Sequence, residues 1–160
     1  MNIFHIFGFS SNKYICPIKP RSGEKPRFWK DSPAHVSVFK HAKDIIIPDP
    51  RNNPLPVYAP AGGTILALVQ HNTLWGQDAS FLPFLNYVTV QSDIPEEFYQ
   101  LCHIAKDSCR FKIGDRIEKG AVIAQTGING YMTDPRHIHF IVGKFTNINP
   151  EGFVSLRIRM

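Results

Sequence analysis

Proline and glycine are the residues that most limit how this chain can fold. Thirteen of its 160 residues are proline and eleven are glycine. Proline removes a backbone donor and breaks helix interiors, so its frequency argues against long helices and for many turns. Short runs of β-branched and aromatic residues lie between the turns, with almost no helical periodicity. The sequence therefore predicts an all-β fold, a barrel-sandwich of short antiparallel strands with long loops around a groove.

The strand pattern is clearest in the middle of the chain. Residues 86–91 alternate as a strand, and residues 97–104 return as the second strand of a hairpin. Residues 57–65 and 113–123 loosely echo each other, because each reads as an apolar strand, a glycine turn and a second apolar strand. This succession supports the barrel-sandwich.

A long segment without a clear strand pattern, residues 71–85, interrupts this series. It holds Leu74, Trp75, Phe81 and Phe84. A loop of this length in a compact domain is usually functional, and its aromatic side chains suit the wall of a substrate groove. A loop that only covers one end of the core is the alternative.

Composition narrows the class of protein. The length fits one domain, and 43% hydrophobic with 19% charged residues is typical of a globular protein. The net charge of +5 is scattered without a dense basic run, which argues against nucleic-acid binding. No apolar run approaches the ~20 residues of a membrane span. Three cysteines without a Cys-x-x-Cys pair indicate neither a disulfide framework nor a structural zinc knuckle.

The N-terminal region reads differently from the rest. Residues 1–33 are irregular and proline-rich, and we expect them to form an extended arm packed on the barrel, with Phe28 and Trp29 as anchors. Residues 34–160 are expected to form the β domain. The first ten residues lack a cationic leading segment and a small-residue cleavage site, so no signal peptide is predicted.

Two histidines near the C-terminus stand one residue apart, in the sequence His137-Ile138-His139-Phe140. On a strand, both project from the same face, ~6.5–7 Å apart along the chain. Such a pair suits a metal ligand beside an acid/base group. Alone the motif is weak, and two partly buried histidines without a partner would be its simpler interpretation.

Other residues of the chain offer the missing ligands. Asp44 opens an apolar run, and a carboxylate is costly to bury there unless it is paired or bound to metal. Capping of a turn is the alternative role for Asp44. His35 lies upstream and can fold back alongside it, with His41 as a nearer competitor, and His103 ends the second hairpin strand.

Residues 35–142 resemble the lysostaphin-type zinc metallopeptidases, peptidoglycan endopeptidases built on a duplicated hybrid motif. Four blocks carry the resemblance in order: an upstream histidine, an aspartate opening an Ile-rich strand followed by PVYAPAGGTI, then YQLCHIAKDS, then FKIGDRIEKGAVIAQTGINGYMTDPRHIHF. The last block is the most specific, since it runs through strand, glycine turn, strand, Thr-Gly turn and a closing His-aliphatic-His-Phe.

The resemblance implies roles for five residues. His35, Asp44 and His139 would hold Zn²⁺, and His137 and His103 would be the catalytic pair that activates the metal-bound water and stabilises the oxyanion. Two imidazoles and a carboxylate leave one zinc position open, as catalytic sites require. The implied activity is that of a zinc-dependent endopeptidase. A metal-activated water would hydrolyse peptide bonds in peptidoglycan cross-links or a related wall peptide.

The chain departs from the family at the first ligand. Many members carry it four residues before the aspartate, where this chain has Lys40. A subgroup has its histidine further upstream, and His35 fits that version. His41 is the fallback, although a residue so close to Asp44 in a strand would point away from it.

Two non-catalytic alternatives remain open. A lipoyl- or biotinyl-carrier module uses similar strand-turn-strand repeats, with Lys43 as a faint candidate for the modified lysine. A degenerate relative would bind wall polymer or activate a wall hydrolase without cleaving. A peptidoglycan substrate would suggest an extracellular or periplasmic location, which conflicts with the lack of a visible signal peptide. The sequence does not predict an oligomeric state.

Overall fold

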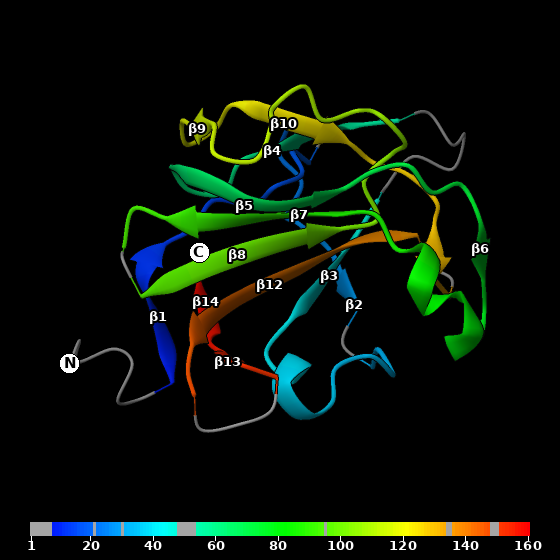
Figure 1. Cartoon of the computed structure of the whole chain (residues 1–160), viewed down its shortest axis with the longest axis horizontal. Coiled ribbons are helices and arrows are strands. Elements are labelled where there is room, and N and C mark those ends of the chain that lie inside the picture. Colours follow the sequence, from blue (N-terminus) through cyan, green and yellow to red (C-terminus); the bar gives the residue numbers. More distant parts are fainter. Residues whose placement is uncertain are drawn as a thin grey trace.

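A computed structural model describes residues 8–20, 22–29, 31–47, 54–94, 96–133, 136–147 and 151–160. In these residues the regular structure is almost entirely strand, with two short 3-10 helices, η1 (Ser37–Phe39) and η2 (Ala79–Phe84). The predicted all-β class is therefore confirmed, in a sandwich-like arrangement rather than a closed barrel (Figure 1). Neither of these helices has the length or apolarity needed to cross a membrane.

An eight-stranded sheet forms the body of the molecule, and its neighbouring strands pair antiparallel. Its longest strand, β12, lies between β3 and β8 and also pairs with β13. The strands, in spatial order with β13 last, are β2 (Phe28–Trp29), β3 (Lys43–Ile46), β12 (His137–Phe145), β8 (Glu97–Cys102), β7 (Tyr87–Ser92), β5 (Gly63–Val69), β9 (Arg116–Ile117) and β13 (Phe153–Ser155).

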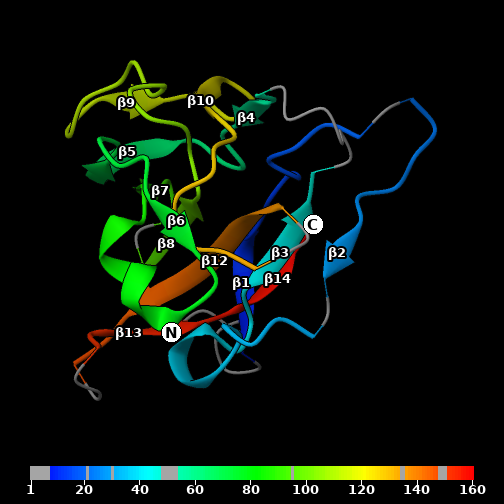
Figure 2. The same cartoon turned by 90° about the vertical axis from the view of Figure 1, so that its right-hand side faces the viewer.

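Three two-stranded sheets complete the fold. They are β4 (Pro56–Tyr58) with β10 (Val122–Gln125), β1 (Phe9–Lys13) with β14 (Arg157–Arg159), and β6 (Trp75–Gly76) with β11 (Gly130–Tyr131). In Figure 2, β4, β9 and β10 lie together as a layer over β5. The similar segments 57–65 and 113–123 form this layer together. Strand β4 of the first pairs with β10 of the second, and β5 pairs with β9. The repeated strand-turn-strand pattern thus lets the two segments interlock.

Strand β12 divides its side chains between the core and the opposite face. Ile138, Phe140 and Val142 are fully buried in the hydrophobic core. His137, His139 and Ile141 alternate with them and line a cavity on the other face. The predicted same-face placement of the two histidines is therefore confirmed.

Residues of the predicted arm are integrated into this fold. Strand β1 pairs with β14, and Tyr14 packs edge-on against the rings of Tyr99 and Phe140 in the core. Phe28 and Trp29 form β2 at the edge of the main sheet, paired with β3. The proposed division of the chain at residue 33 stays a prediction.

A buried carboxylate fastens the N-terminal strand to the sheet. Glu97, at the start of β8, is fully buried and accepts hydrogen bonds from the backbone N–H groups of Ser11 and Asn12. It also accepts a 3.0 Å hydrogen bond from the hydroxyl of Tyr14. Burial, as the largest influence, raises the pKa of Tyr14, so this phenol stays protonated and donates.

Candidate metal centre

The register of the main sheet brings Asp44 and His139 together. Strands β3 and β12 run antiparallel with His139 directly opposite Asp44. Nδ1 of His139 lies 2.5 Å from Oδ1 of Asp44, and the carboxylate is fully buried. Two residues 95 positions apart in the chain thus meet through strand pairing alone.

His35 reaches the same carboxylate from the loop between β2 and η1. This loop is tight, because the backbone N–H of His35 bonds the carbonyl of Ser32 at 3.2 Å. Nε2 of His35 lies 3.1 Å from Oδ1 of Asp44, and its ring centroid is 5.3 Å from that of His139. The three candidate ligand atoms all lie within 4.8 Å of one another.

His41 is not part of this group. Its backbone N–H instead faces the hydroxyl of Ser155, at 3.4 Å. Between the two histidines left open by the sequence, the fold brings His35 to Asp44.

The cluster contains polar atoms whose hydrogen-bonding capacity is not used. Nε2 of His35 and Oδ2 of Asp44 are both buried without a hydrogen-bond partner in the described structure. The 3.1 Å contact of His35 is with the other carboxylate oxygen, Oδ1, and is not a hydrogen bond. Leaving a buried polar atom unpaired costs about 1–3 kcal/mol. Two imidazole nitrogens and one carboxylate oxygen are also the donor set of an open, catalytic-type metal site. The residues therefore fit a divalent metal ion.

The charge state of Asp44 agrees with such a site. Burial, the largest single influence, would raise the pKa of Asp44, but the hydrogen bond with His139 and the nearby charges of His139 and His137 together outweigh it. The pKa of Asp44 is therefore held well below its usual range. The carboxylate is ionised at neutral pH, which is the form that binds metal.

The other two predicted site residues lie beside the cluster. Nε2 of His137 is 3.7 Å from Oδ2 of Asp44, and the ring of Trp29 packs against it at 5.9 Å. The rings of His137 and His103 are 4.9 Å apart and nearly perpendicular. All five residues predicted from the sequence thus converge on one small region.

His103 is held in an unusual conformation. Its φ of 65° lies in the left-handed region, which costs a non-glycine residue free energy and is concentrated at functional sites. Its backbone N–H donates to the carbonyl of Asn86 at 2.9 Å, and Nδ1 donates to the carbonyl of Asn129 at 2.8 Å. Since a carbonyl only accepts, the proton of the neutral ring lies on Nδ1 and the lone pair on Nε2.

The pKa of His103 is strongly displaced. Burial, first, and then the neighbouring charge of His137 lower the pKa of His103 to about 3. The imidazole is therefore neutral at physiological pH.

Sequence reasoning missed the amides that support His103. Asn86 and Asn129 are fully or almost fully buried. The backbone N–H of Asn86 donates to Oδ1 of Asn129 at 2.8 Å, and Nδ2 of Asn129 donates to the carbonyl of Ile104 at 2.8 Å. The only signal in the sequence is Asn129 between Gly127 and Gly130, a pattern that by itself predicts no more than a turn.

A glycine completes this support. The N–H of Gly127 donates to the carbonyl of His103 at 2.7 Å. A Cβ at position 127 would lie 2.6 Å from the Cα of Ala105, so only glycine permits this approach. The turn thereby fixes the backbone that carries the His103 ring.

A cavity of about 150 Å³ opens over the histidines. The long segment of residues 71–85 does line it, as predicted, but through Leu82 and Leu85. The prediction that its aromatic residues form the wall was wrong, because this segment folds into β6 and η2, and Phe81 and Phe84 pack on each other, 6.2 Å apart. The cavity is lined by Trp29, Ser32, Pro33, Ala34, Phe39, Leu82, Leu85, Gln100, Cys102, His103, Tyr131, Thr133, His137, His139 and Ile141.

Solved structures with the same fold were found by structural comparison. LytU matches over 92% of this chain and 86% of its own, at 20% identity and a TM-score of 0.54. Pseudoalterin, an M23 metalloprotease from the deep sea, matches over 84% of this chain and 72% of its own, at 13% identity and a TM-score of 0.57. The catalytic domain of lysostaphin from Staphylococcus simulans matches over 72% and 74%, at 18% identity and a TM-score of 0.50.

Other comparisons set limits on this similarity. No protein-family model matches the sequence, and no curated protein is similar to it. The matched region spans only 26% of a zinc-containing peptidase from Vibrio cholerae and 38% of lysostaphin in solution. At identities of 13–20%, the three likenesses above establish the architecture. The resemblance read from the sequence is thus confirmed at the level of the fold, and the chain has the fold of the lysostaphin-type peptidases.

Proposed function

We propose that this protein is a zinc-dependent endopeptidase that hydrolyses peptide bonds in peptidoglycan cross-links or a related wall peptide. The observation that carries the proposal is the buried His35–Asp44–His139 cluster, with two polar atoms left without hydrogen bonds. It lies in a fold shared with an antimicrobial peptidase, lysostaphin, and an M23 metalloprotease, Pseudoalterin.

In this proposal His35, Asp44 and His139 hold the zinc ion. When bound, zinc supplies Lewis acidity, which polarises a peptide carbonyl and makes water easier to deprotonate. The ionised Asp44 provides the negative charge that favours a divalent cation among the histidines. The sheet register and the tight turn before His35 hold the ligands on rigid backbone.

His137 is assigned the proton transfer. Its Nε2 faces the Asp44 carboxylate from the side of the cavity, so it lies next to the ligands without being one. An imidazole there accepts the proton of the attacking water and returns it to the leaving amine. The ring of Trp29 packs against His137 and limits its rotation.

His103 is assigned to the attacking water. With its Nδ1–H donated to the carbonyl of Asn129, Nε2 carries the lone pair in the neutral ring. Nε2 therefore accepts a hydrogen bond from the water that attacks the peptide and helps His137 to activate it. The low pKa of His103 keeps the ring in this neutral form at physiological pH.

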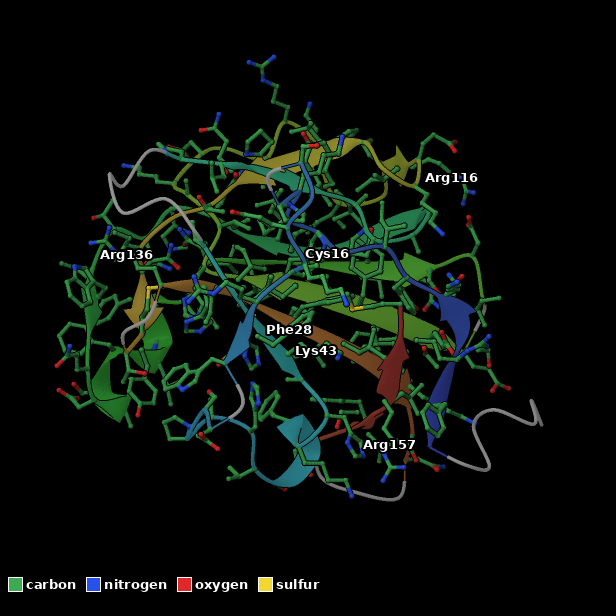
Figure 3. All side chains as sticks on the ribbon, turned by 180° about the vertical axis from the view of Figure 1, so that it is seen from behind. Cys16, Phe28, Lys43, Arg116, Arg136 and Arg157 are labelled. Carbon is green, nitrogen blue, oxygen red and sulfur yellow. The ribbon has the colours of Figure 1, made fainter. Side chains whose placement is uncertain are left out.

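The carrier alternative finds no support in the fold. A carrier presents its modified lysine at a hairpin tip, whereas Lys43 lies within β3 of the main sheet. Its ammonium group sits 4.7 Å from the centroid of the Phe28 ring, and Figure 3 shows the two residues on neighbouring strands.

The experiment combines metal analysis with cleavage. The purified protein is titrated with zinc, stripped with a chelator and reloaded, and each form is incubated with peptidoglycan sacculi of several cross-bridge types while newly released amino groups are measured. We expect one tight zinc site per chain, loss of release on chelation and recovery on reloading. The control is His139→Ala. Absence of a tight zinc site, or equal release by that variant, would contradict the proposal.

A further inference from the structure

The cavity extends beyond the histidines along the face of β12 that points away from the hydrophobic core. Ile141 follows His137 and His139 on the same face, and the alternation of a strand places it ~6.5–7 Å beyond His139. Together with Gln100 and Cys102 of β8, Ile141 forms the floor of this extension. The extension is therefore continuous with the proposed reaction centre.

Two segments distant in the sequence form the walls. Pro33 and Ala34 come from the loop that carries His35, and Phe39 ends the following η1. Leu82 and Leu85 come from the other side, in and after η2. Figure 2 shows these two segments, the cyan coil of η1 and the green coil of η2, flanking β12. Among the described residues that line the cavity, none is a lysine, arginine, aspartate or glutamate.

The size and chemistry of the cavity match an apolar side chain. An engineered cavity of about 150 Å³ lined by Leu, Ile and Phe stays dry and binds benzene. The whole cavity here, including the part over the histidines, also has a volume of about 150 Å³. At its mouth, Leu82 and Phe39 remain 54% and 36% exposed, which leaves apolar surface for an incoming group to cover.

From these observations, and resting on the proposed peptidase function, we propose that the cavity is a specificity pocket for a leucine-sized apolar side chain next to the scissile bond. The substrate is then a peptide with such a residue at the cleaved position rather than a run of glycines. A glycine would leave Leu82 and Leu85 uncovered, and would forgo the free energy of burying their surface.

Two series of blocked hexapeptides test the inference. In each, an all-glycine peptide is compared with peptides that carry Leu, Asp or Lys on one side or the other of the central bond. We expect the zinc-loaded protein to cleave the best leucine peptide with a kcat/KM at least about 10-fold above that of the all-glycine peptide, since filling an apolar pocket gives discrimination of this order per group. Equal or faster cleavage of the all-glycine peptide would overturn the pocket and leave the peptidase function standing.

A matched pair of variants tests whether the preference for leucine arises in this cavity. Leu82→Ser removes an apolar wall residue that is 54% exposed, and Leu74→Ser changes a leucine that is 55% exposed but does not line the cavity. We expect Leu82→Ser to reduce the leucine preference about 5-fold and Leu74→Ser to leave it unchanged. Equal effects of the two variants would overturn the assignment.

Binding separates this inference from the proposed function. The same peptides are titrated calorimetrically into the zinc-loaded His137→Ala variant, which keeps the apolar wall residues Leu82 and Leu85. We expect the leucine peptide to bind at least about 10-fold more tightly than the all-glycine peptide. If no peptide is cleaved by the unaltered protein but this binding preference holds, the peptidase function fails and the pocket stands. If the two peptides bind equally, the pocket is refuted.

Discussion

Asp44 and Glu97 are both fully buried carboxylates on strands of the main sheet, but their surroundings differ. Glu97 accepts hydrogen bonds from two backbone N–H groups and the hydroxyl of Tyr14. Asp44 is faced by imidazoles of His35, His137 and His139, and its Oδ2 has no hydrogen-bond partner in the part of the chain that the structure describes.

The difference separates a structural carboxylate from one that we propose binds metal. Glu97 is held by neutral donors, which stabilise its charge and join residues 11–14 to a strand more than eighty positions later. Asp44 is surrounded by imidazoles, which are side chains of a type that can bind metal, and among the described residues its Oδ2 and Nε2 of His35 have no hydrogen-bond partner. Burial alone therefore does not identify a site, whereas the chemistry of the partners does.

The largest contrast should come from removing the two carboxylates in turn. We expect Asp44→Ala to lose tight zinc binding and to lower peptide cleavage at least ~10³-fold, because several kcal/mol of transition-state stabilisation depend on the metal. Metal content after dialysis and cleavage rate measure this. Glu97→Ala is the control and should keep its zinc. Comparable zinc loss in both variants would mean that Asp44 acts only through folding.

Within the site, loss of the proposed proton carrier should affect the rate of cleavage but not the binding of zinc. His137→Ala removes a histidine that lies 3.7 Å from Asp44 but outside the ligand group. We expect kcat to fall on the order of 10²-fold, the usual scale for a lost acid/base, with zinc stoichiometry unchanged. Rate and bound zinc are measured on the same sample. A variant that keeps its full rate would exclude His137 from proton transfer.

The structural carboxylate should show its effect in stability. Glu97→Ala leaves two backbone donors and the Tyr14 hydroxyl without their acceptor, and we expect a loss of about 3 kcal/mol in the free energy of unfolding. Urea denaturation measures it. Glu96→Ala is the control, since that 51%-exposed side chain pairs with Lys144 at the surface and should cost less than about 1 kcal/mol. Equal losses would show that the hydrogen bonds of Glu97 contribute no more to the free energy of unfolding than an ion pair at the surface.

Asn86 supplies a smaller test of how the site is supported. Its side-chain amide donates to the carbonyl of Ile104, the residue after His103, at 3.2 Å and lies outside the group of three proposed ligands. We expect Asn86→Ala to lower kcat about 10-fold, because outer residues that orient site groups typically have effects of this size. The affinity for zinc should not change, and calorimetric titration with zinc checks this. Weakened zinc binding would place Asn86 in support of the metal ligands instead of His103.

The sequence by itself determined the features that depend on local pattern. Frequent prolines and glycines ruled out long helices, and the alternation around His137 and His139 put both histidines on one face of a strand. The run of apolar residues after Asp44 marked a buried strand, now β3. These follow from backbone sterics and side-chain periodicity, which act over a few residues.

Only the tertiary structure decided which distant residues meet. The turn at residues 32–36 brings His35 to Asp44 while His41 stays outside the group. The fold also put Leu82 and Leu85 in the cavity wall in place of the aromatic residues, and Asn86 and Asn129 behind His103. Such contacts depend on strand register and loop packing between segments tens of residues apart, and local sequence patterns do not encode that register.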